Sequence, residues 1–150
     1  MGSPGDPAPP PTRLRRQAAS NGLHVDMAAD LTQLAPARRM VRAWLDDRGV
    51  ERVVAEDIVL VCSEACANAI EHGAQSDPAA WVELSITATN GSLVIRVAGP
   101  GPWRPAGEHM DGRGRGLGIM RALSDDFGID ARSSGTVVTA TREVRARHMP

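Results

Sequence analysis

An apolar segment near the middle of the chain carries a polar residue at every fourth position. Glu64, Asn68 and His72 are spaced four residues apart within residues 56–72, and this spacing places all three on one face of an α-helix. The residues between them are small, so the other face can pack closely against a second layer. The pattern predicts a helix over Glu56–His72 that ends at Gly73. The polar stripe is either a functional site or the ordinary solvated face of an amphipathic helix.

Two glycine-rich stretches follow this helix. Residues 99–105 come directly after a strand-like run, and residues 111–118 open a short apolar segment. Glycines at alternate positions let backbone N–H groups approach an anion without interference from Cβ atoms. A helix that begins there adds partial positive charge. Arg113 and Arg115 would add formal charge beside a phosphate. The alternative is that these arginines only keep a surface loop soluble.

In this order the motifs resemble the GHKL (Bergerat-fold) ATPases, and in particular the anti-sigma-factor serine-protein kinases of the actinobacterial type, which carry a histidine kinase-like ATP-binding domain. The resemblance spans roughly Leu23–Arg142. The matching residues are Glu64, Asn68, Ala69, His72 and Gly73 in the helix, Gly101, Trp103, Arg104 and Pro105 in the first glycine-rich stretch, residues 115–123 in the second, and Gly135, Thr136 and Val138 near the C-terminus.

The resemblance implies that ATP and Mg²⁺ bind between the helix and the two glycine-rich stretches. Glu64 would act as the catalytic base that accepts the proton of a serine hydroxyl. Asn68 would coordinate Mg²⁺, and Thr136 would reach the base of the nucleotide. The nucleotide-binding residues that the resemblance implies are Asn68, His72, Gly99, Gly101, Arg113, Gly114, Arg115, Gly116, Leu117, Gly118 and Thr136.

One position departs from the family pattern. The family carries an aspartate two residues before the first glycine of its first glycine motif, and this aspartate recognises the adenine amino group. Gly99 occupies that position here, or Val97 if the motif is aligned on the preceding glycine. Because a buried amine without an acceptor costs free energy, the sequence predicts weak and poorly selective ATP binding.

The resemblance implies an ATP-binding anti-sigma-factor regulator. Such a protein sequesters a sigma factor and phosphorylates a serine on an anti-anti-sigma (STAS-domain) antagonist. Two alternatives remain. A degenerate, non-catalytic protein-binding module of the same fold agrees with the missing aspartate. The catalytic domain of a sensor histidine kinase would need an upstream helix pair with a phosphorylatable histidine, which the short Pro-rich N-terminal segment does not supply. Homodimerisation is left open.

Composition narrows the class of protein further. The 150 residues suit one domain, and a net charge of −1 argues against a nucleic-acid binder. No apolar run reaches the roughly 18 residues of a membrane span, and no signal peptide is recognisable. Cys62 and Cys66 lack the further ligands of a metal site, so we expect buried free thiols. A reducing, cytoplasmic location is the expectation that follows.

The pattern along the chain predicts three segments, namely a disordered Pro- and Arg-rich tail over residues 1–22, an ATPase domain over 23–143 and a C-terminal tail over 144–150. The expected elements are strand 23–27, helix 37–48, helix 56–72, strands 81–88 and 92–97 joined by Asn90-Gly91, a loop or lid over 99–114, helix 117–123, and strands 126–131 and 137–142 with their turn at Gly135-Thr136. This order predicts an α+β two-layer sandwich with helices on one face of a mixed, mainly antiparallel sheet, as in the histidine kinase-like ATPase fold.

Overall fold

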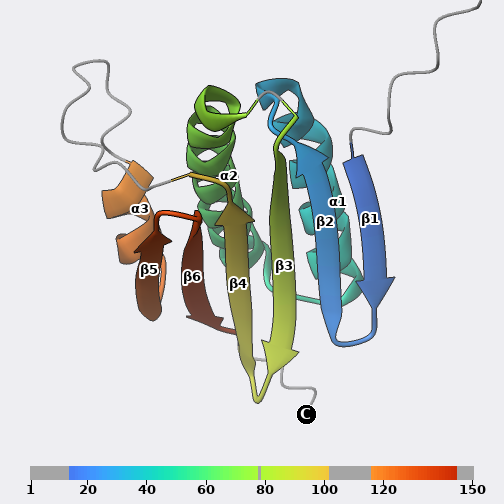
Figure 1. The fold of residues 1–150 in the computed structure, drawn as a ribbon. Coiled ribbons are helices and arrows are strands. Elements are labelled where there is room, and N and C mark those ends of the chain that lie inside the picture. The colour runs from blue at the N-terminus through green and yellow to red at the C-terminus, as the bar shows by residue number, and fades with distance from the viewer. Residues whose placement is uncertain (1–13, 78, 102–115, 145–150) are drawn as a thin grey trace, which may run out of the picture.

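The protein folds into two layers, a six-stranded sheet and a set of helices that cover one of its faces (Figure 1). The computed structural model describes residues 14–77, 79–101 and 116–144, and the side chains of all of these except 73–76. The elements are β1 (Leu14–Ala19), β2 (Gly22–Ala28), a 3₁₀ turn (Leu31–Gln33), α1 (Leu34–Asp47), α2 (Arg52–Ser76), β3 (Trp81–Thr89), β4 (Ser92–Gly99), α3 (Gly116–Ala122), β5 (Asp126–Arg132) and β6 (Gly135–Glu143). The predicted α+β two-layer fold is confirmed.

The sheet has the strand order β1-β2-β3-β4-β6-β5, and every described pair of neighbours is antiparallel. The expectation of a mixed sheet is corrected in this detail. The physical reason lies in the crossover between β2 and β3. Helices α1 and α2 pack side by side, so they carry the chain away from one end of the sheet and back to it. Strand β3 therefore starts where β2 finishes and runs in the opposite direction.

Strand β1 lies inside the segment that we expected to be a disordered tail. Leu14 pairs with Met27 and Ala19 pairs with Gly22, which makes β1 and β2 a tight hairpin. Five of the six β1 side chains are exposed, so the strand carries no hydrophobic pattern and is held by its backbone pairing. The expected boundary at residue 22 is therefore wrong for residues 14–22, which belong to the domain.

Two turns test the expected boundaries of other elements. The Asn90-Gly91 hairpin turn is confirmed, and both residues have positive φ angles, 47° and 78°, as a type I′ turn requires. The expected turn at Gly135-Thr136 is wrong, because Gly135 already pairs with Arg132 and the turn consists of the two serines between them. Helix α2 also continues through Gly73 to Ser76, since one glycine costs a helix only about 1 kcal/mol.

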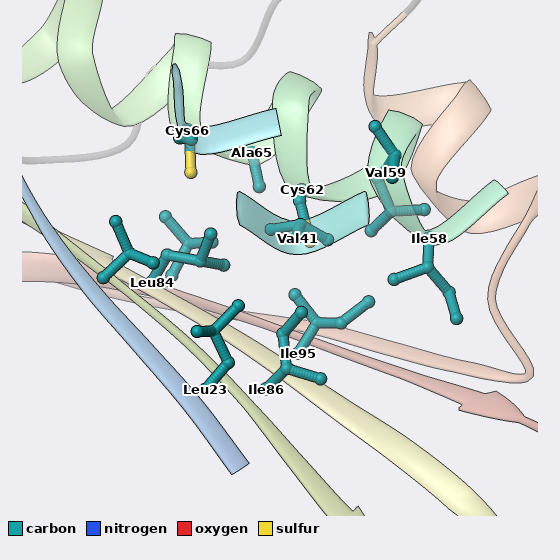
Figure 2. Close-up of a cluster of buried hydrophobic side chains, with 14 of the residues drawn as sticks. Leu23, Val41, Ile58, Val59, Cys62, Ala65, Cys66, Leu84, Ile86 and Ile95 are labelled. Atoms are coloured by element: carbon teal, nitrogen blue, oxygen red, sulfur yellow. The ribbon is translucent and has the colours of Figure 1, made fainter. Parts of the chain in front are cut away.

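The core lies between the sheet and helices α1 and α2, and it is built almost entirely from aliphatic side chains. Figure 2 shows Val41 of α1 and Ile58, Cys62 and Cys66 of α2 facing aliphatic residues of the strands, among them Ile86. Both cysteines are buried and free, as expected. Among the described helices, none is long and apolar enough to cross a bilayer.

The buried thiols lead to an expected alkaline destabilisation. Burial raises the pKa of the Cys66 thiol to about 12. Burial also raises the pKa of the Cys62 thiol well above its ordinary value, and the neighbouring Cys66 adds to this shift. Above the ordinary thiol pKa the unfolded chain loses protons that the native state keeps. The free energy of unfolding should therefore fall by up to about 1.4 kcal/mol per pH unit for each thiol.

This effect can be isolated because the chain contains no lysine and no tyrosine, whose side chains normally titrate in the same range. Urea denaturation from about pH 8 to about pH 11 measures it. In a Cys62→Ala/Cys66→Ala variant the stability should be nearly constant over this interval. An equal alkaline loss in parent and variant would show that the thiols do not cause it.

Candidate functional site

Glu64 and Asn68 of α2 lie against the first residue of α3. A Cβ atom at Gly116 would lie 2.6 Å from Glu64 Oε2 and 3.9 Å from Asn68 Nδ2. Gly116 is itself buried, and the two α2 side chains are half-buried. Any side chain at position 116 would therefore displace the carboxylate. The four-residue spacing placed the carboxylate and the amide on one helix face, and the tertiary structure adds a bare backbone segment in front of them.

A pocket lies beside this contact, between α2 and the ends of β4 and β6. It is lined by Ala65, Ala69, His72, Val97, Gly99, Pro100, Gly101, Thr136 and Val138. The cavity volume is about 10 Å³, which is room for about one water molecule. The apolar walls of the pocket would therefore have to move apart to admit the ring of a nucleotide base.

Thr136 supplies a polar group to this largely apolar pocket. It pairs with Gly99 across the β4–β6 ladder, and its hydroxyl donates a hydrogen bond of 2.9 Å to the carbonyl oxygen of Gly101. The hydroxyl proton is thus committed, so the lone pairs of Oγ1 remain as acceptors. Gly101 has a φ of 88°, a conformation that favours glycine there.

Gly99 allows a close approach between β4 and α2. A Cβ atom at Gly99 would lie 3.0 Å from the Cβ of Ala69, so a side chain here would need Ala69 to give way. The φ of Gly99 is outside the left-handed region, and the backbone itself does not exclude another residue. Val97, the position that the other alignment gives, is 1% exposed and lines the pocket as well.

The remaining expected site residues divide into two groups. Arg113, Gly114 and Arg115 lie outside the described residues. Leu117 and Gly118 are in α3, where Leu117 packs against the core and Gly118 is exposed with open space around it.

Sequence reasoning missed the small residues that form the apolar walls of the pocket. Ala65 and Ala69 were interpreted as packing residues, and Pro100 was assigned no role, yet all three line it. Their signal was the run of small side chains on α2 itself, because a helix without bulky residues leaves room beside a sheet. Arg38 of α1 was also missed, and it donates a hydrogen bond of 3.1 Å to the hydroxyl of Ser63, next to Glu64.

The fold and this arrangement define an ATPase domain of the histidine kinase-like type. The family of histidine kinase-like ATPase domains matches residues 27–142, and the chain belongs to this family. The chain is similar to a solved structure, that of the RsbU and RsbW domains of Rv1364c from Mycobacterium tuberculosis. The match covers 89% of this chain, with a TM-score of 0.67 and 26% sequence identity. This chain covers 36% of the length of that one. The expected histidine kinase-like ATPase family is thereby confirmed.

Proposed function

We propose that this chain is an ATP-dependent anti-sigma-factor-type regulator, which sequesters a sigma factor and phosphorylates a serine on a STAS-domain antagonist in the cytoplasm. The observation that carries the proposal is the contact of Gly116 with Glu64 and Asn68, beside a small, largely apolar pocket. Membership of the histidine kinase-like ATPase family implies nucleotide binding, generally with Mg²⁺. The likeness to a protein with an RsbW domain supports the choice of partners.

The residues present fit Mg-ATP at the phosphate end. Asn68 offers an amide oxygen, which is a suitable ligand for a hard cation. The space that a Cβ atom at Gly116 would need is taken by the Glu64 carboxylate, so the proposed base lies directly beside the start of α3. The base end is a small, largely apolar pocket, and the carboxylate that the family uses to read adenine is replaced by Gly99.

Within this proposal each residue has a distinct role. Bound Mg-ATP would supply the phosphoryl group and a cation that offsets its negative charge. Asn68 holds the cation, and Glu64 accepts the proton of the incoming serine hydroxyl. Gly116, which has no side chain, leaves room for this carboxylate. Thr136 reaches the base end of the nucleotide through its hydroxyl.

A second function is favoured by the same pocket. A non-catalytic protein-binding module of this fold would tolerate the absence of the acid at Gly99, since such a module needs no tight adenine recognition. The two functions differ in their response to Mg²⁺. Calorimetry with ATP in the presence and absence of Mg²⁺, with GTP as control, separates them, because only the kinase requires a metal-dependent gain in affinity.

An Asn68→Ala variant should lose most of the gain in ATP affinity that Mg²⁺ provides. The substitution removes one oxygen ligand, and Mg²⁺ tolerates incomplete coordination poorly. Calorimetric titrations with and without the metal measure the gain directly. Gln17→Ala, which removes an exposed amide from β1, is the matched control and should retain it. The same Mg²⁺ enhancement in Asn68→Ala as in the parent would contradict the metal role.

A further inference from the structure

Helix α3 depends on tertiary contacts for its position. It has only seven residues, two of which are glycines, and a helix of this length and composition is not stable alone. It nevertheless brings Gly116 against Glu64 and Asn68. Figure 1 shows α3 beside α2 at the edge of the helical layer. Whatever holds α3 therefore also sets the geometry of the proposed nucleotide site.

A guanidinium group from β6 bonds the C-terminal end of α3 and links it to α2. Arg142 Nη1 donates a hydrogen bond of 2.8 Å to the carbonyl oxygen of Leu123, directly after α3. Arg142 Nη2 donates to Asp57 Oδ2 of α2 at 3.1 Å. The side chains of Arg142 and Asp57 are only 25% and 27% exposed. Arg142 thus joins three elements in a partly shielded environment, where such contacts are stronger than on the open surface.

The two ends of α3 meet the same face of α2. Asp57, Glu64 and Asn68 are seven and four residues apart, and these spacings place them on one helix face. Asp57 and Glu64 are separated by roughly 10 Å along α2, and seven residues of α3 span about the same length. The C-terminal end of α3 is therefore linked through Arg142 to Asp57, and its first residue, Gly116, lies against Glu64. Buried Met120 lies between the two ends.

We propose that Arg142 is a positioning residue for the nucleotide site, together with its partner Asp57. By tying the end of α3 to α2, it keeps Gly116 at the carboxylate of Glu64 although it lines no part of the pocket itself. This inference rests on the proposed nucleotide binding at that site. Arg142 and Asp57 are 85 residues apart in the sequence, and for this reason no local sequence pattern indicates that they pair.

Arg142→Gln tests the proposal, since it keeps a hydrogen-bond donor but removes the charge and the fork that spans two acceptors. The affinity for Mg-ATP should fall roughly 3- to 30-fold, the range in which residues outside a site usually act. Arg142→Lys can donate well to one of the two acceptors. Its affinity for Mg-ATP should therefore lie between those of Arg142→Gln and the parent. It also serves if the glutamine variant does not fold.

The control is Arg42→Gln. It breaks the exposed Arg42–Glu56 ion pair, which also ends on α2, with the same change in charge and no contact to α3. We expect its Mg-ATP affinity to stay within about twofold of the parent, as exposed pairs contribute little. An equal loss in Arg42→Gln and Arg142→Gln would show a general effect on stability or charge and overturn the proposal. So would an unchanged affinity in Arg142→Gln.

Amide hydrogen exchange without nucleotide gives a second measurement that does not require binding. The amides of Leu123 and Ser124, which bond back to α3, should exchange faster in Arg142→Gln, while that of Ala55 in α2 should not change. If the parent binds no nucleotide, the proposed function fails, and exchange alone decides whether Arg142 anchors α3. Unchanged exchange at Leu123 and Ser124 would then overturn the anchoring.

Discussion

A Glu64→Gln variant is expected to bind Mg-ATP within a few-fold of the parent and to transfer phosphate to the serine of a STAS-domain antagonist about 10²–10⁴ times more slowly. Glutamine keeps the shape of the side chain that Gly116 contacts, so the site should remain assembled. What it lacks is a group that accepts a proton. Calorimetry measures the binding, and single-turnover transfer from labelled ATP measures the rate.

Glu56→Gln is the matched control for this variant, because Glu56 is an exposed carboxylate two turns earlier on the same helix. Its transfer rate should equal that of the parent. Undiminished transfer by Glu64→Gln would remove Glu64 from the catalytic role. It would favour a different base. Absence of transfer in both the parent and the variant would favour the non-catalytic binding module.

Restoring a carboxylate at position 99 is expected to create ATP selectivity that the parent lacks. We expect the parent to bind ATP weakly and to distinguish it poorly from GTP. Gly99→Asp alone would crowd Ala69, whose Cβ lies 3.0 Å from the new one. In the background of Ala69→Gly, the same change should tighten ATP binding by about 1–3 kcal/mol, or about 5- to 150-fold, and leave GTP binding little changed.

The comparison that isolates this gain is between Ala69→Gly and the double variant, because the helix glycine itself costs about 1 kcal/mol of stability. Val97→Asp tests the other alignment and should destabilise the fold, since Val97 is 1% exposed and a buried carboxylate is costly. Tight, ATP-selective binding by the parent would refute the expectation. It would mean that Thr136 or an ordered water reads the adenine unaided.

Local patterns were sufficient for most of the secondary structure. The alternation of buried and exposed residues identified β2, β3 and β4, and the helical period identified α1 and α2. Strand β1 escaped because its side chains are exposed, so its sequence carries no burial signal. The end of α2 was placed too early, since tertiary packing can carry a helix past a glycine such as Gly73.

The sequence by itself determined which polar groups share one face of α2. The spacing of Glu64 and Asn68 put a carboxylate and an amide on one helix face, because a helix repeats every 3.6 residues whatever surrounds it. Only the tertiary structure decided what those groups meet. Gly116 against Glu64, Gly99 against Ala69, and Arg142 between Leu123 and Asp57 join residues that are 19 to 85 positions apart. Contacts at such separations depend on how the layers pack, and packing leaves no periodic trace in any one segment.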